Sequence, residues 1–159
     1  MIDPQGQKAA GNGSKFEDII EDAVCGILSI PSLRWDAQTF VLSKDRDILW
    51  KNVPYVSIYG TNCRSEFVLQ FKGRKIRIEC KYQESAGSVD EKLPYLMMNF
   101  TREVPEEETI IIIEGEGFRE GAVNWLRESC QQTKCKVFNA TQFLFYLTSI
   151  NANCKQEQT

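Results

Sequence analysis

The sequence contains no histidine among its 159 residues. Histidine is the commonest general base in enzymes, so its absence excludes Ser-His-Asp and Cys-His mechanisms of nucleophilic catalysis. It also removes a usual zinc ligand, and the six cysteines include only one close pair, Cys130 and Cys135, so we predict no zinc site. If the protein is an enzyme, carboxylates, lysine and a metal ion must therefore perform its chemistry.

The chain also lacks a long apolar run, because no stretch approaches the ~20 residues that a transmembrane helix requires. Its first residues, MIDPQGQKAAGNGS, are polar and do not form a signal peptide. We therefore expect a protein of the cytoplasm, or of a host cell's cytoplasm if a phage encodes it, with reduced cysteines and no membrane partner. The length and ordinary composition predict a single domain at residues 15–152, with flexible tails at 1–14 and 153–159.

Periodicity and turn residues predict an alternation of helices and strands. The segment 32–51 holds short apolar pieces that suit either loop or edge strand. Ser88 could cap the second helix, with Glu91 at the capping-box position, although Pro94 must kink that helix or mark its true start. Either Thr141 or Asn139 caps the last helix. The predicted helices cover residues 15–28, 88–100, 118–131 and 142–150, and the predicted strands cover 54–60, 66–71, 75–82, 109–114 and 136–138.

Two of these strands form a predicted hairpin that brings two carboxylates together. The segment 75–83 alternates strictly between charged or polar and apolar residues, as a half-buried strand does. The segment 66–71 alternates as well, and Gly73 between the two suits a two-residue turn. Counting outward from this turn places Glu66 directly opposite Glu79, about 5 Å apart at Cβ.

Two carboxylates this close repel each other unless a cation or a shared proton lies between them. Glu66, Glu79 and the neighbouring Lys81 therefore form a candidate divalent metal site. Lys, Arg and Glu are also common on the solvent face of strands, so the charge pattern taken alone is more often that of a solvated face. The acids are concentrated away from the hairpin, notably at 106–108 and 114–120. The basic residues on or beside the hairpin therefore suggest a side that contacts phosphate: Lys72, Arg74, Lys75 and Arg77.

The motif Glu79-Cys80-Lys81, preceded across a hairpin by an acidic residue, resembles the PD-(D/E)XK nuclease superfamily, in a phage- or defence-type branch. The predicted order of elements over residues 16–114 is similar to the core of that superfamily: a helix, three antiparallel strands, a helix and a further strand. The sequence departs from the family at Glu66, where the superfamily usually has Asp after Pro.

Three further features are similar to members of the same superfamily. Glu17 follows Gly13 at the start of the first predicted helix, as a helix glutamate does in many members. Gln83 follows the motif lysine by two residues, as in several branches. The segment 82–99 resembles the linker and helix of restriction-enzyme-like and phage-encoded members.

The resemblance implies an α/β, restriction-endonuclease-like fold: a central mixed β-sheet flanked by helices, in the order αβββαβ with a C-terminal αβα. It implies a Mg²⁺-dependent endonuclease, with Mn²⁺ as a substitute, that hydrolyses phosphodiester bonds in nucleic acid, DNA in particular, and that can act as a homodimer. A catalytically degenerate member, serving as a nucleic-acid-binding or protein-interaction module, is the alternative.

The resemblance also implies residue roles. The catalytic residues would be Glu66, Glu79, Lys81 and Gln83, with Lys81 holding the attacking water and Gln83 contacting backbone or orienting Lys81. The metal ligands would be Glu17, Glu66, Glu79 and the backbone carbonyl of Cys80. Glu17 is equally typical of an acid that stabilises a helix N-terminus, and Glu21 is the other candidate for a ligand from the first helix.

Overall fold

The computed structural model describes residues 4–156, and the side chains of residues 11–153. No helix in this part of the chain is long and apolar enough to cross a membrane. The elements follow in the order α1 (Pro4–Leu28), β1 (Ser32–Arg34), α2 (Ala37–Leu42), β2 (Ile48–Val56), β3 (Asn62–Phe71), β4 (Arg74–Tyr82), the 3₁₀ helix η1 (Ser88–Lys92), α3 (Leu93–Met98), the π-helical turn η2 (Asn99–Glu103), β5 (Glu108–Glu114), α4 (Glu120–Cys130), β6 (Cys135–Phe138) and α5 (Ala140–Gln156).

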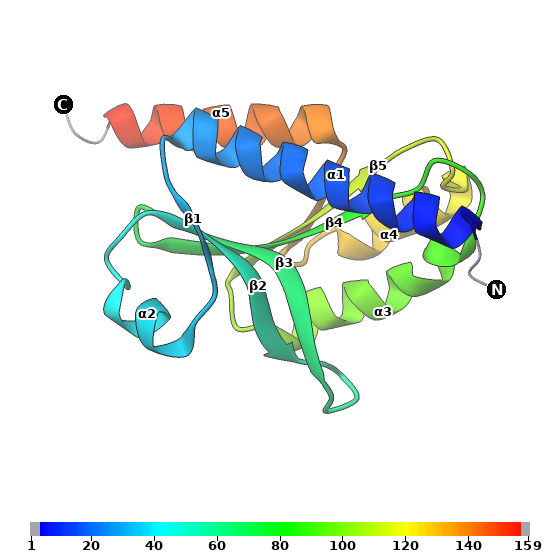
Figure 1. Ribbon diagram of the computed structural model, residues 1–159, viewed down its shortest axis with the longest axis horizontal. Helices are drawn as coiled ribbons and strands as arrows, with labels where there is room; N and C mark the ends of the chain where they lie inside the picture. Colours follow the sequence, from blue (N-terminus) through cyan, green and yellow to red (C-terminus); the bar gives the residue numbers. More distant parts are fainter. Residues whose placement is uncertain (1–3, 157–159) are drawn as a thin grey trace.

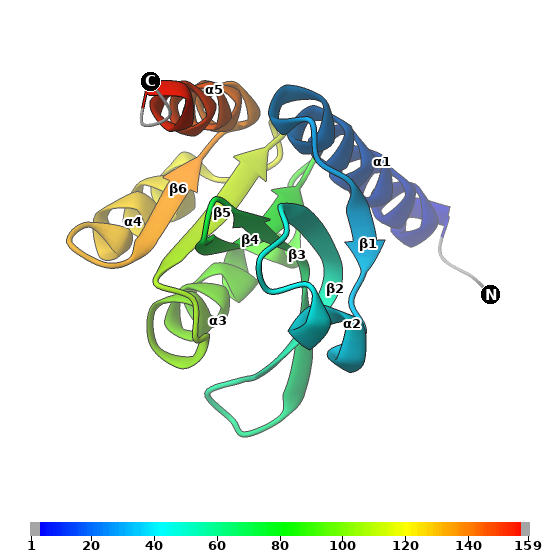
Figure 2. The same cartoon turned by 90° about the vertical axis from the view of Figure 1, so that its left-hand side faces the viewer.

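Six strands form one mixed sheet in the spatial order β1-β2-β3-β4-β5-β6. Strands β2, β3 and β4 are antiparallel neighbours, whereas β1–β2, β4–β5 and β5–β6 pair in parallel. Helices α1 and α5 cover one face of the sheet, and α3 and α4 cover the other (Figures 1 and 2). The predicted fold, a mixed sheet with helices on both faces, is therefore confirmed.

The layer formed by α1 and α5 depends on apolar side chains that recur every four residues. Phe16, Ile20 and Val24 of α1 are buried on the sheet, and a similar stripe on α5 packs beside them. The side-chain amide of Asn151 on α5 donates a hydrogen bond of 3.0 Å to the carbonyl of Ile27 on α1. The first and last helices are thus joined directly.

The first and last helices are both longer than predicted. Helix α1 begins at Pro4 rather than at Lys15, so residues 4–14, which we expected in a flexible tail, are helical. Gly11 and Gly13 each cost a helix roughly 1 kcal/mol but do not end it. The side chain of Asn12 between them bonds the carboxylate of Glu84 at 2.7 Å. Helix α5 likewise continues to Gln156, beyond the predicted end of the domain at 152.

The first strand of the meander was also misplaced. It begins at Ile48 and ends at Val56, because Ser57 and Thr61 close a turn through a backbone hydrogen bond of 2.9 Å. The apolar residues of 37–42 form helix α2 instead of loop or strand. Its N-cap is Asp36, whose carboxylate accepts a hydrogen bond from the backbone N–H of Thr39 at 2.9 Å.

The two remaining helix ends resolve alternatives that the sequence left open. Pro94 stands in the first turn of α3, so it marks the true start of that helix, and the 3₁₀ turn before it has no side-chain cap. The predicted capping box at Ser88 is therefore wrong. Asn139 rather than Thr141 caps α5, because its side chain accepts the N–H of Gln142 at 2.8 Å.

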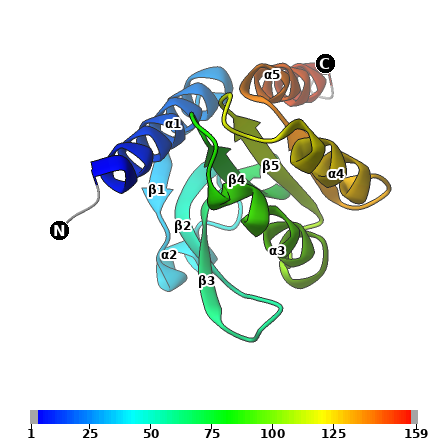
Figure 3. The same cartoon turned by 90° about the vertical axis from the view of Figure 1, so that its right-hand side faces the viewer.

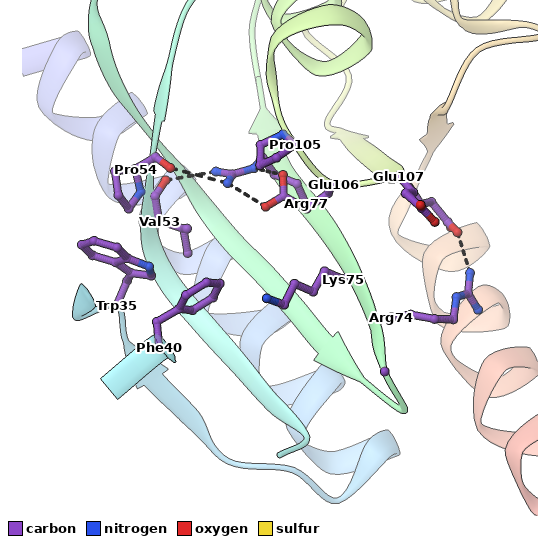
Figure 4. A pocket seen from close by; sticks show the side chains of 12 residues that line it. Trp35, Phe40, Val53, Pro54, Arg74, Lys75, Arg77, Pro105, Glu106 and Glu107 are labelled. Atoms are coloured by element: carbon purple, nitrogen blue, oxygen red, sulfur yellow. Dashed lines mark hydrogen bonds and ion pairs between the residues drawn. The ribbon is translucent and has the colours of Figure 1, made fainter. Parts of the chain in front are cut away.

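The polar face of β4 is buried or half-buried from Arg77 onward rather than solvated, and Arg77 is its centre. The Arg77 side chain is 2% exposed. Its Nε and Nη2 donate to the carboxylate of Glu106 at 2.7 and 2.9 Å, and its Nη1 donates to the carbonyl of Val53 at 3.1 Å (Figure 4). The same Nη1 donates to the hydroxyl of Ser65 at 2.7 Å. Arg77 thus connects β4 to β2, β3 and the segment that precedes β5.

The predicted separation of basic and acidic residues is wrong. Glu106 pairs with Arg77, and Glu108 pairs with Arg74 at 2.6 Å. Lys72 pairs with Asp47 at 3.1 Å. Three of the four basic residues at the hairpin are therefore engaged within the protein, and the fourth, Lys75, places its ammonium 4.4 Å from the centre of the Phe40 ring.

We predict that Arg77→Met lowers the free energy of unfolding by about 3–5 kcal/mol, because it leaves the buried carboxylate of Glu106 without a partner. Adding Glu106→Leu should recover part of this loss, since no unpaired buried charge then remains. Arg74→Met is the control: its side chain is 52% exposed, so its loss should stay within about 1 kcal/mol. Urea denaturation measures all three, and equal losses for Arg77→Met and Arg74→Met would contradict this account.

Candidate active site

The hairpin between β3 and β4 has the predicted register. Its turn consists of Lys72 and Gly73, both at positive φ (49° and 76°), which is the two-residue turn that matches strand twist. The pairing of the two strands continues outward to Phe67 opposite Ile78 and ends there. Glu66 is the first residue of β3 beyond this pairing.

Glu66 marks the point where β3 separates from β4. Its carboxylate accepts a hydrogen bond from the backbone N–H of Cys80 at 2.8 Å. The backbone N–H of Glu66 in turn lies 3.4 Å from the carboxylate of Glu79. The Glu66 side chain therefore satisfies a strand N–H at the place where the ladder ends, and this contact holds it beside Glu79.

A residue on β2 that the sequence analysis missed interrupts the regular alternation of side chains between the two faces of the sheet. Asn52 on β2 has a φ of +58°, a conformation that Asn tolerates better than most residues. Trp50 and Val53, on either side of it, belong to the same buried cluster although they are three residues apart, so the strict alternation of the strand is broken here. Across the sheet, Trp50 pairs with Val68 and Val53 pairs with Ser65, which places Glu66 at the break.

Lys81 joins the two carboxylates. Its Nζ lies 2.6 Å from an oxygen of Glu79 and 3.5 Å from an oxygen of Glu66. The three side chains are 24%, 11% and 17% exposed for Lys81, Glu79 and Glu66, so the cluster is mostly buried yet reaches the surface. The sequence prediction that these three residues form one cluster agrees with this geometry.

The electrostatics of the cluster follow from burial and like charge. Burial, and then the neighbouring carboxylate of Glu79, raise the pKa of Glu66 well above its usual value, although Lys81 opposes both effects. Burial alone would lower the pKa of Lys81, but Glu79 and Glu66 outweigh it, so the pKa of the Lys81 ammonium is raised. Positive charge is therefore strongly favoured at this position.

The structure distinguishes the two candidate acids of α1. Glu21 accepts hydrogen bonds from Ser32 and from Lys51, the latter at 3.0 Å, so it ties α1 to β1 and β2. Glu17 lines a cavity together with Glu66. Burial raises its pKa, Lys81 lowers it and Glu79 raises it again, which places both groups within its electrostatic reach.

A cavity of about 420 Å³ opens beside Glu17 and Glu66, lined by residues of α1 and of strands β1 to β3. Three basic residues that the sequence analysis did not single out also line it: Arg34, Lys51 and Arg64. They come from three different strands, so no local pattern could have brought them together. They give this cavity both charges, as a site for a phosphodiester beside carboxylates would need.

Gln83 does not contact the cluster through its side-chain hydrogen bonds. Its Nε2 donates to the carbonyl of Gly117 at 2.8 Å, and its Oε1 accepts the N–H of Val89 at 3.2 Å. The side chain therefore holds the segment after β4 against the segment after β5. Its expected contact with backbone is present, but it is protein backbone, and Lys81 is oriented by Glu79 and Glu66 instead.

The donor chemistry of the cluster fits a hard divalent cation. Glu66 and Glu79 offer the carboxylate oxygens that such cations prefer, and Glu17 lies nearby. Among the described residues, no three side chains of Asp, Glu, Cys or His are grouped closely enough to hold a metal as they stand. A cation would therefore take two carboxylates and complete its shell with backbone oxygen and water.

Comparison with known proteins accounts for this geometry. The family model of the PD-(D/E)XK nuclease superfamily domain matches residues 12–153. The chain belongs to this superfamily. The match names the superfamily without naming a branch within it, so the phage or defence branch stays a prediction.

Other comparisons add little to this assignment. No curated protein sequence matches the chain. Among solved structures, the chain is similar to the crystal structure of protein VC1899 from Vibrio cholerae, with 14% sequence identity and a TM-score of 0.48 over 98% of this chain. The chain spans 36% of the length of that protein.

Two glycines that follow β5 allow this segment to approach the backbone that follows β4, where the Gln83 side chain joins the two segments. A Cβ on Gly115 would lie 2.3 Å from the carbonyl oxygen of Gln83, and Gly115 has a φ of +103°. A Cβ on Gly117 would lie 2.4 Å from the carbonyl oxygen of Ser85. Both contacts involve backbone, so neither can be relieved by a side-chain rotation.

We predict that Gly115→Ala lowers the free energy of unfolding by about 1–3 kcal/mol and displaces the segment that follows the cluster. Gly121→Ala is the control, because a Cβ there meets nothing within 4 Å and α4 should gain up to about 1 kcal/mol from alanine. Thermal unfolding of the two variants beside wild type tests this. If Gly115→Ala melts with the wild type, the backbone contact is not needed.

Proposed function

We propose that this protein is a metal-dependent nuclease, an endonuclease that hydrolyses phosphodiester bonds in DNA. The observation that carries this proposal is the contact of Lys81 with both Glu66 and Glu79 at the point where β3 leaves β4. Membership of the nuclease superfamily supports the same reaction. The mixed charges of the adjoining cavity support a phosphodiester as the group it receives.

Phosphodiester hydrolysis needs an activated water, and it needs positive charge where negative charge builds on the phosphate and on the leaving oxygen. A Mg²⁺ ion held by Glu66, Glu79 and the carbonyl of Cys80, or Mn²⁺ in its place, would supply a more acidic water and charge neutralisation. The side chain of Glu17 would add a further oxygen or a ligand for a second ion.

Lys81 would act as a donor and a fixed positive charge rather than as a base. Glu79 and Glu66 raise the pKa of its ammonium, so the group keeps its proton at neutral pH and has no lone pair with which to accept one. Its N–H groups are available to hold the attacking water and to stabilise the phosphate oxygens. The proton of the water must therefore leave to another acceptor.

The alternative is a catalytically degenerate module that binds nucleic acid or protein. The observation that favours it is the same pairing of Lys81 with Glu66 and Glu79, because the ammonium already neutralises charge that would otherwise attract a metal ion. Divalent metal binding separates the two functions, since a degenerate module should bind Mg²⁺ or Mn²⁺ poorly and cut nothing.

Three further assignments belong to this proposal. A single chain presents one cluster, so cutting both strands of a duplex in one encounter would need a homodimer. The family assignment implies a nucleic-acid substrate, and the choice of DNA is part of the proposal. The five described cysteines are free, which supports a reducing compartment such as the cytoplasm.

We predict that Glu79→Gln abolishes Mg²⁺-dependent cleavage of plasmid, linear and single-stranded DNA, because it removes the charge of a metal ligand. Lys81→Met should slow cleavage about 10²–10³-fold, the usual cost of losing one preorganised donor. Chelation by EDTA should stop the wild-type enzyme. Cleavage rates of the purified proteins measure all three effects.

The control for Lys81→Met is Lys75→Met, a lysine on the same face of β4 whose ammonium lies over the Phe40 ring instead of the carboxylates. It should cut at the wild-type rate. Because the Glu79 side chain is only 11% exposed, circular dichroism must show that its variant is folded. Wild-type cleavage rates in both Glu79→Gln and Lys81→Met would show that this cluster is not the active site.

We predict that Glu17→Gln weakens Mn²⁺ binding, measured by isothermal titration calorimetry, while leaving the melting temperature near that of wild type. Glu21→Gln should do the reverse: it keeps the metal affinity, but it loses the charge that pairs with Lys51 and one of the two oxygens that accept from Ser32 and Lys51, at a cost of about 0.5–1.5 kcal/mol in stability. An unchanged metal affinity in Glu17→Gln would remove the first helix from the site.

A further inference from the structure

An exposed pair of aromatic rings lies at the end of the hairpin that carries Glu66. Tyr59, in the turn between β2 and β3, stacks on Tyr95 of α3 with ring centres 5.1 Å apart and planes 23° apart. Tyr59 is 74% exposed. One face of its ring is therefore covered by Tyr95, while most of the side chain remains in contact with solvent.

This stack is held in place by polar contacts on both sides of it. The N–H of Ile58 donates to the side chain of Asn99 at 2.8 Å, which fastens the turn to the helical segment that follows α3. The hydroxyls of Ser57 and Thr61 bond each other at 2.7 Å across the base of the turn. The position of the aromatic surface is thus fixed by the fold. The protein would therefore lose little conformational freedom when a ligand binds there.

The stack is continuous with the active site. Tyr95 contacts Cys63 of β3 through its hydroxyl, at 3.8 Å. Tyr55 of β2 pairs with Cys63 across the hairpin, and the guanidinium of Arg77 on β4 lies 5.4 Å from the centre of the Tyr55 ring. In Figure 3 the β2–β3 hairpin projects below the rest of the sheet, and the β3 residues from 62 to 66 span only about 13 Å at the usual rise of a strand.

We propose that the Tyr59–Tyr95 stack binds an unpaired base of the substrate, so that the protein acts on nucleic acid with a single-stranded segment; this rests on the proposed nuclease function of the adjoining cluster. A base has the size and shape to cover the open face of Tyr59, and stacking accepts every base. Bases inside an intact duplex are covered by their neighbours and cannot reach the ring.

The size and charge of the surface favour this occupant over a protein. Two tyrosine rings offer far less than the roughly 1,000 Å² that a stable protein interface needs. One basic side chain, Lys92, is exposed one turn before Tyr95 and suits a phosphate of the same strand.

The test is fluorescence anisotropy of the full chain with a short labelled single-stranded DNA and with the duplex of the same sequence, in EDTA so that nothing is cut. Tyr59→Ala should weaken binding of the single strand about 5- to 100-fold and leave duplex binding unchanged. Tyr59→Trp should restore it. Lys92→Gln should weaken both DNAs by a similar factor, since a phosphate contact does not depend on unpaired bases.

Phe145→Ala is the matched control, because Phe145 is 73% exposed but lies on α5, on the other face of the sheet; it should bind both DNAs as wild type does. Equal loss of both DNAs in Tyr59→Ala, or no loss, overturns the proposal. So does a change in sedimentation of Tyr59→Ala without a change in DNA binding, which would mark a contact between proteins.

The nuclease proposal and the stacking-site proposal can be rejected independently of each other. Tyr59-dependent binding of single strands by a wild-type protein that cuts nothing under Mg²⁺ or Mn²⁺ would retain the stacking site and reject the nuclease. Normal Mg²⁺-dependent cleavage of single strands by Tyr59→Ala, with normal binding, would retain the nuclease and reject the stacking site.

Discussion

The arrangement of the site depends on one buried guanidinium. Arg77 bonds Glu106, Val53 and Ser65 at once, so the segments that surround the carboxylate cluster are fixed relative to each other. A buried charge is costly unless it is paired and fully hydrogen-bonded, and here both conditions are met. The hairpin of β2 and β3 can therefore leave the sheet immediately beyond Ser65 without loosening β4.

The cluster itself arises from an interruption of regular structure. In a continuous ladder, the N–H of Cys80 would bond a carbonyl of β3, and Glu66 would stand on one face of the sheet. With Asn52 in a left-handed conformation, the strands change face at this point, and the Glu66 carboxylate takes the Cys80 N–H. The same interruption brings two acids to one ammonium and opens a cavity beside them.

The sequence predicted what is local and missed what is distant. The register that brings Glu66 to Glu79 follows from one short turn and a period of two, so it could be counted along the chain. Glu106, the partner of Arg77, lies 29 residues away in the sequence, and no periodic pattern relates the two residues. The sequence analysis therefore interpreted Arg77 as a phosphate contact, whereas it forms a buried ion pair. The choice between Glu17 and Glu21 likewise required the packing of α1 on β1 and β2, because both lie near the same side of one helix.

The joining of α1 to α5 has a consequence for the order in which the protein becomes active. The strands that hold Glu66, Glu79 and Lys81 are all synthesised before residue 83, but the layer in which α1 packs is completed by α5, and Asn151 bonds Ile27 across it. A growing chain on the ribosome thus carries its central hairpin long before Glu17 has a fixed position. The site would be complete only after α5 has left the ribosome.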